Sequence, residues 1–129
     1  MPSSPIKPGF CFRLRDLTTG EWSHLWVAIT APTGPEDSCL CANITDRKSF
    51  DDDSCILQAG EHPFLRFESV VAYSKAKVYP LGRLKSHPQV VEEFDPFRDE
   101  LVKRIQLGGK SSDFISPSNR RLIEAELGP

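Results

Sequence analysis

The chain has 129 residues, of which 39% are hydrophobic and 26% are charged, and its formal net charge is −2 at pH 7. This length fits one domain of ordinary globular composition, so 1–129 is treated as a single domain. The slight acidity argues against a surface coated with nucleic-acid-binding charge, although a local basic cleft is compatible with it. No apolar run approaches the roughly 20 residues that cross a membrane, and residues 1–10 have no signal-peptide pattern. We therefore expect a cytoplasmic protein without membrane contact, whose four cysteines are reduced.

Five segments before Pro80 have the patterns of short strands, after an irregular proline-rich arm at 1–9. Residues 10–14 alternate apolar and polar side chains, which is the period of a half-buried strand. Residues 25–29 (LWVAI) are continuously apolar and predict a central strand buried on both faces. The remaining predicted strands are 39–45, 55–57 and 70–78.

After Pro80 the apolar residues follow the spacing of helices. Asp95-Pro96 has a side-chain cap and a proline at the first helical position, so it predicts the start of a helix over 95–106. Gly108-Gly109 would be its stop. Val90 and Val91 fit a shorter helical turn before it, and a final helix is predicted over 117–127.

Strands grouped first and helices later predict an α+β fold. The expected architecture is a small antiparallel β-barrel over 10–78, followed by a helical C-terminal part over 80–129 that contains two helices. In the strand 39–45, alternation would place Leu40 and Ala42 on one face and the cysteines on the other.

The cysteines, together with His62, could in principle be combined into a zinc site. Structural zinc takes cysteine pairs two to four residues apart on turns, whereas Cys39 and Cys41 have one residue between them inside a predicted strand. Buried, reduced cysteines acting as small hydrophobic residues are the favoured interpretation. We therefore expect no metal and no cofactor. No cysteine has the basic neighbourhood of a nucleophile.

Two histidines lie at the ends of predicted strands and could act as general acid and base near neutral pH. His24 precedes the apolar strand 25–29, and His62 follows the short strand 55–57 in a Gly-Glu-His-Pro sequence. The alternative for His62 is structural, because the ring could simply hold this turn through a backbone carbonyl.

Thr45, Asp46, Arg47 and Lys48 end a predicted strand with a hydroxyl and three charged groups. A solvated turn accounts for this run. In the functional interpretation, Arg47 and Lys48 hold a phosphate while Thr45 or Asp46 assists proton transfer. Four aromatic residues could stack on bases: Trp22, Trp26, Phe64 and Phe67. For Trp26, a place in the core is the favoured interpretation.

Three segments resemble, in order and character, parts of the MazF/PemK (CcdB-like) family of toxin endoribonucleases: 20–30 (GEWSHLWVAIT), 42–45 (ANIT) and 69–77 (SVVAYSKAK). The resemblance covers about residues 10–85. It implies an SH3-like barrel, usually a homodimer, that cleaves single-stranded RNA without a metal and is paired with an antitoxin protein. The family has an arginine-proline pair where this chain has Ser23-His24, so the imidazole would replace the arginine.

The resulting hypothesis is metal-independent RNA cleavage, in which the 2′-hydroxyl attacks the adjacent phosphate. His24 and His62 would share the acid and base roles. Arg47 would stabilise the charge of the phosphorane, and Thr45 would orient the phosphate. The substrate-binding residues would be Trp22, Asp46, Lys48, Ser74 and Lys75.

The alternative is a non-catalytic SH3-like barrel that binds a protein partner in its groove. A basic cleft at the predicted site would favour RNA, whereas an apolar groove would favour a protein ligand.

Overall fold

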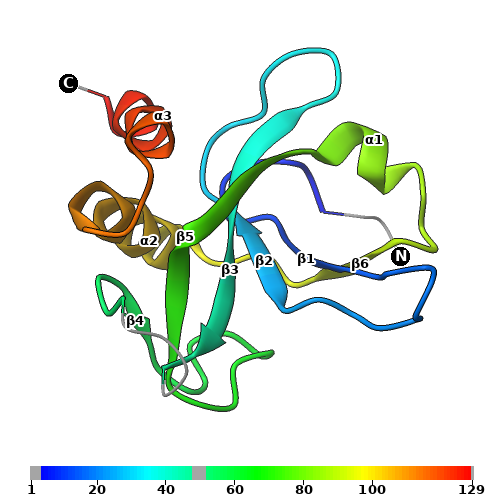
Figure 1. Ribbon diagram of the computed structural model, residues 1–129, viewed down its shortest axis with the longest axis horizontal. Coiled ribbons are helices and arrows are strands. Elements are labelled where there is room, and N and C mark those ends of the chain that lie inside the picture. Colours follow the sequence, from blue (N-terminus) through cyan, green and yellow to red (C-terminus); the bar gives the residue numbers. More distant parts are fainter. Residues whose placement is uncertain (1–3, 48–51, 129) are drawn as a thin grey trace.

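The computed structural model describes residues 4–47 and 52–128, in which six strands form one antiparallel sheet with the order β4-β5-β3-β2-β1-β6. The strands are β1 (Cys11–Leu14), β2 (Leu25–Ala28), β3 (Ser38–Asp46), β4 (Ile56–Leu57), β5 (Ser69–Pro80) and β6 (Val91–Phe94). The helices are α1 (Leu81–Lys85), α2 (Asp99–Ser111) and α3 (Pro117–Leu127). The sheet curls like half of a barrel, and α2 and α3 lie together on one side of it (Figure 1). The α+β class and the two C-terminal helices are therefore confirmed.

The curl of the sheet follows from an irregularity between its two longest strands. β3 pairs with β5 in two registers, Cys41 opposite Lys77 and Asn43 opposite Ala72, so β5 contains extra residues between them. Such bulges bend a strand and increase its twist. The bend lets β5 begin beside the connection from β4 and end at α1 (Figure 1).

The two faces of the sheet are covered by separate apolar clusters. Leu40, Ala42 and Ile44 of β3 face the main core, which also contains buried side chains of α2 and α3. Cys39 and Cys41 face a second cluster that includes Leu81 of α1. The alternation predicted for 39–45 is therefore confirmed.

β1 is more deeply buried than its sequence pattern predicts. Phe10, Cys11 and Phe12 are all at most 1% exposed. Cys11 belongs to the main core and the two phenylalanines to the second cluster. The strand was expected to be half-buried, but cysteine at the presumed polar position is itself a small apolar side chain.

The four cysteines are free thiols inside the protein. Burial raises the pKa of each thiol, to about 12 for Cys39, so the thiols are protonated at neutral pH. Within residues 4–47 and 52–128, no group of three or more His, Cys, Asp or Glu side chains is arranged to hold a metal ion. No helix of the same residues is both long and apolar enough to span a bilayer.

The segment after Pro80 is not purely helical, which corrects the sequence prediction. Val91 belongs to strand β6, which pairs antiparallel with β1, and not to a helical turn. Arg13 lies opposite Glu92 in this ladder, and its Nε is 2.6 Å from the Glu92 carboxylate. The strand forms by pairing with β1, which lies about 80 residues earlier in the chain. No local sequence pattern reveals such a pairing.

Helix α2 begins and ends later than predicted. Asp95 and Pro96 lie in the connection between β6 and α2, which is held by the backbone N–H of Phe97 donating to the carbonyl of Gly9 (2.9 Å). At the other end the helix continues through Gly108 and Gly109 to Ser111.

These two glycines permit close packing and do not end the helix. A Cβ added at Gly108 would lie 2.6 Å from Oη of Tyr73 and 2.7 Å from Cβ of Cys55. A Cβ added at Gly109 would lie 2.5 Å from Cδ1 of Ile123. The Tyr73 hydroxyl donates to the carbonyl of Ile105 at 2.5 Å, which fixes α2 against β5.

The final helix has the bounds predicted from the sequence. Pro117 occupies its first turn, and Oγ of Ser116 accepts the backbone N–H of Asn119 at 3.2 Å. Ile123 is fully buried in the main core. Local capping chemistry was sufficient to locate this helix.

Candidate functional site

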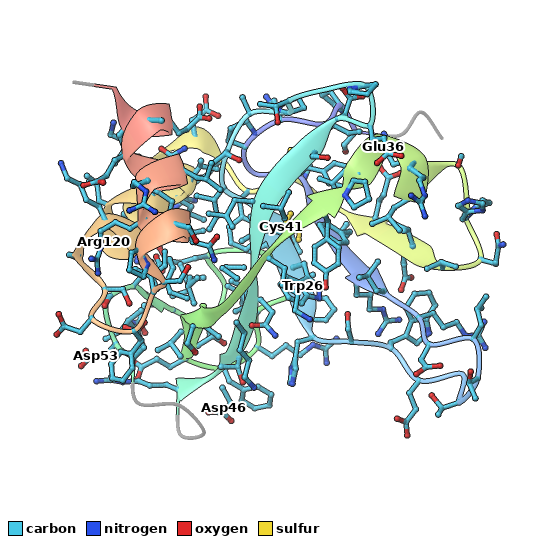
Figure 2. All side chains as sticks on the ribbon, turned by 45° about the horizontal axis from the view of Figure 1, so that its top comes forward. Trp26, Glu36, Cys41, Asp46, Asp53 and Arg120 are labelled. Atoms are coloured by element: carbon cyan, nitrogen blue, oxygen red, sulfur yellow. The ribbon has the colours of Figure 1, made fainter. Side chains whose placement is uncertain are left out.

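A cavity of about 1020 Å³ lies at the end of the sheet where β2 begins and β3 ends. Its other walls come from the connection between β4 and β5, from the end of β6 and from Ser4 of the N-terminal arm. Figure 2 shows Asp46, which lines the cavity, at the opposite end of the molecule from Glu36 near α1. The cavity therefore lies at the end of β3 remote from α1.

Four of the residues predicted to form the site line this one cavity: His24, Thr45, Asp46 and His62. The first three meet because β2 and β3 are antiparallel neighbours, with Leu25 opposite Ile44. His62 reaches the same place from the β4–β5 connection. The structure thus brings together groups that are up to 38 positions apart in the sequence.

His62 is held by the backbone on both sides of its ring. Nδ1 accepts the N–H of Phe64 at 3.0 Å, which leaves Nε2 as the donor to the carbonyl of Asp95 at 2.5 Å. The ring stacks on Phe97 with 4.5 Å between centroids, and the residue is only 3% exposed. Both nitrogens are thus engaged in holding the turn and the segment before α2, as in the structural interpretation of this histidine.

His24 has a different environment. It is exposed at the start of β2, and its backbone carbonyl accepts the Ser23 hydroxyl at 2.8 Å. Of the two histidines that line the cavity, His24 is the one whose imidazole is accessible to a ligand.

Arg47 lies beside this cavity, in a smaller one of about 480 Å³ that it shares with Asp46, Phe67 and Glu68. Its Nη1 is 2.7 Å from Oε1 of Glu68. This hydrogen bond lowers the pKa of the Glu68 carboxyl and raises that of the Arg47 guanidinium. A carboxylate therefore compensates the charge predicted to bind phosphate. Lys48 lies outside the described residues.

Arg66 is a cavity residue that the sequence reasoning missed. It is exposed, and within residues 4–47 and 52–128 it forms no ion pair. Two aromatic side chains beside it are also accessible, Phe64 at 39% and Phe67 at 70%. The signal was present in the sequence, since HPFLRF places an arginine between two phenylalanines directly after the turn histidine.

The charge of the cavity wall is mixed. Asp46, Glu93 and Asp95 contribute carboxylates, whereas His24 and Arg66 are the basic groups. Glu93 is itself engaged, because Oε1 accepts the N–H of Ser4 at 3.1 Å and Oε2 lies 3.9 Å from Nζ of Lys85. The rim is therefore not the strongly basic cleft that would favour RNA on charge alone.

Three predicted substrate-binding residues do not reach the cavity. Ser74 and Lys75 are exposed on β5 within its irregular part. Trp22 lies on the hairpin between β1 and β2, where its backbone forms an isolated β-bridge with that of Arg15. Trp26 fills the second apolar cluster, as expected, and Figure 2 shows it close to Cys41.

Comparison with protein-family models, with curated protein sequences and with solved structures finds no match to this chain.

Proposed function

We propose that the chain is a toxin-like endoribonuclease that cleaves single-stranded RNA without a metal, and that the cavity at the end of β2 and β3 is its active site. The supporting observation is the meeting of His24, Thr45 and Asp46 with Arg66 in one cavity. An imidazole, a carboxylate, a hydroxyl and a guanidinium can supply the acid, the base, the phosphate hydrogen bond and the charge stabilisation of phosphodiester cleavage by a neighbouring hydroxyl.

In the proposed reaction, Asp46 accepts the proton of the 2′-hydroxyl while the 2′-oxygen attacks the phosphorus. The bond from phosphorus to the 5′-oxygen breaks, and the imidazolium of His24 gives its proton to that oxygen. The products are a 2′,3′-cyclic phosphate and a 5′-hydroxyl. Arg66 replaces Arg47 as the group that stabilises the phosphorane charge, and Thr45 donates to a phosphate oxygen.

His62 has a positioning role in this proposal. Its two backbone hydrogen bonds fix the turn that carries Phe64, Leu65 and Arg66. His24 is therefore the general acid, and Asp46 replaces His62 as its partner and acts as the general base.

The exposed aromatic residues favour an unpaired substrate. Phe64 and Phe67 can stack on bases that have left a duplex, and base-paired RNA does not offer such faces. The SH3-like identity of the half-barrel, the homodimer, the antitoxin partner and the cytoplasmic location belong to the same proposal and stay predictions.

One observation favours the second candidate, a non-catalytic module that binds a protein partner. Leu25, Ile44 and Leu65 provide an apolar lining, and the charges around them are mixed. An apolar groove with a polar rim is the usual form of a peptide-binding site.

The test is single-turnover cleavage of a labelled single-stranded RNA in the presence of EDTA. We expect wild type to produce cyclic phosphate ends, and His24→Ala to lower the rate by roughly 10²–10⁴-fold with an unchanged melting temperature. His87→Ala is the matched control, because His87 is exposed and lies outside the cavity. Absence of cleavage by wild type, or equal rates for all three proteins, would leave the protein-binding module as the better proposal.

A further inference from the structure

A strip of aromatic rings and guanidinium groups continues from the cavity onto the hairpin between β1 and β2. It begins at Phe94 of β6, which lines the cavity and contacts Phe64 edge-on, with 4.8 Å between ring centroids. The guanidinium carbon of Arg13 lies 5.6 Å from the centroid of Phe94 and 4.5 Å from that of Trp22. Arg15 extends the row, 5.6 Å from the Trp22 centroid. We call Phe94, Arg13, Trp22 and Arg15 the hairpin strip.

Strand pairing holds the hairpin strip in place. β6 is the neighbour of β1 in the sheet, with Cys11 opposite Phe94, and Arg15 forms a β-bridge with Trp22 across the hairpin. The residues of the strip therefore lie at paired positions of neighbouring strands, and the backbone sets the spacing between their side chains. This rigidity reduces the entropy lost when a flexible ligand binds.

The charges of the hairpin strip are unequal along its length. Arg13 is paired with Glu92, with Nε 2.6 Å from the carboxylate. Arg15 donates from Nε to the carbonyl of Gly20 at 3.3 Å, and among residues 4–47 and 52–128 it has no ion-pair partner. The strip thus has partly exposed rings and a paired guanidinium next to the cavity, and an exposed, uncompensated cation at its far end.

We propose that the hairpin strip binds the nucleotides that flank the cleaved phosphate, an inference that rests on the proposed RNA substrate. Planar rings and guanidinium groups stack on bases without requiring a particular sequence. The uncompensated guanidinium of Arg15 pairs with a backbone phosphate. The strip accounts for Trp22, which the sequence singled out for substrate binding and which lies outside the cavity.

The consequence is a dependence of affinity on RNA length. A short oligonucleotide fills the cavity alone, whereas a longer one also covers the hairpin strip. Loss of one stacked base weakens nucleic-acid binding by about tenfold, so removal of Trp22 should affect the long ligand and spare the short one.

The experiment measures binding of 2′-O-methyl RNA, which cannot attack its own phosphate, as a 4-mer and as a 12-mer. Wild type should bind the 12-mer at least tenfold more tightly than the 4-mer. Trp22→Ala and Arg15→Gln should each weaken 12-mer binding by about tenfold and leave 4-mer binding unchanged, and an unchanged 12-mer affinity in both variants would refute the strip. Trp22→Phe, which keeps a ring, should retain most of the gain. Leu17→Ala is the control, since Leu17 is 62% exposed on the same hairpin and outside the strip.

Trp22 also reports occupancy directly, because the other tryptophan, Trp26, is buried and only 6% exposed. The 12-mer should change the tryptophan emission and the 4-mer should not. Equal binding of both lengths, or equal loss for both in Trp22→Ala, would refute the strip while leaving the cavity as an RNA site. Failure of wild type to bind either RNA would refute both proposals.

Discussion

His62 donates from Nε2 to the carbonyl of Asp95 at 2.5 Å and so joins the β4–β5 connection to the chain segment that leads into α2. The same ring accepts the N–H of Phe64 through Nδ1 and stacks on Phe97. A single buried side chain thus holds one wall of the cavity in place.

The first prediction concerns the stability that this histidine provides. His62→Ala removes both hydrogen bonds and the ring stack, and leaves the Phe64 N–H and the Asp95 carbonyl without the partners that they have in the folded protein. We expect the free energy of unfolding to fall by about 2–3 kcal/mol. Urea denaturation followed by circular dichroism measures this loss, with His87→Ala as the exposed control. A loss below about 0.5 kcal/mol would contradict the role assigned to the ring.

A second prediction compares the contributions of Arg66 and Arg47 to the rate of RNA cleavage. Arg66→Ala should lower the RNA cleavage rate by about 10²–10³-fold, because in the proposed reaction Arg66 stabilises the charge of the phosphorane. Arg47→Ala should have a much smaller effect, since Glu68 already compensates that guanidinium at 2.7 Å. Single-turnover rates of the two variants check this order. A larger effect at Arg47 would restore the role that the sequence assigned to it.

The third prediction concerns Gly108. Alanine usually stabilises a helix relative to glycine, by about 1 kcal/mol. Here the new Cβ would lie 2.6 Å from the Tyr73 hydroxyl and 3.0 Å from the backbone oxygen of Ser54, so α2 would have to move away from β5. We expect Gly108→Ala to destabilise the protein by about 1–3 kcal/mol.

Lys110→Ala in the same helix is the matched control, because Lys110 is exposed. Thermal melts of the two variants measure the difference. An increase in melting temperature for Gly108→Ala would show that the contact between α2 and β5 is looser than described.

A fourth prediction concerns alkaline pH. Burial raises the pKa of all four thiols in the folded protein, to about 12 for Cys39, and it raises the pKa of Tyr73 as well. In the unfolded chain a thiol loses its proton near pH 8.5. The folded state therefore binds more protons above this pH, and its stability falls as the pH rises, by up to about 1.4 kcal/mol per pH unit for each such group.

Urea midpoints measured between pH 7 and 10 test this dependence. Cys41→Ala should flatten the curve, because it removes one of the buried thiols. The same thiols should react with an aromatic disulfide reagent only after unfolding. A midpoint that is constant up to pH 10 would contradict the burial assigned to them.

Features of the fold that depend on neighbouring residues could be predicted from the sequence. The last helix is an example, because Ser116 and Pro117 carry its cap within four residues. The two faces of β3 are another, since alternation alone separates Leu40 from Cys41.

Features that depend on distant partners could not be predicted. β6 forms through pairing with β1, and Gly108 is required by Tyr73 and Cys55, neither of which is near it in the sequence. At the site, antiparallel pairing made the meeting of His24 and Thr45 predictable. The compensation of Arg47 by Glu68 was not, because it depends on side-chain geometry 21 residues apart.

The order of the sheet has a consequence for association between copies of the chain. Its two outermost strands are β4, with two residues, and β6, with four residues of sequence VEEF. Edge strands expose backbone groups that can recruit a foreign strand, and shortness and charge are the usual protection against it. Both ends of the described sheet have this protection, so the fold should resist aggregation through its edges even at the high concentrations of an overexpressed protein.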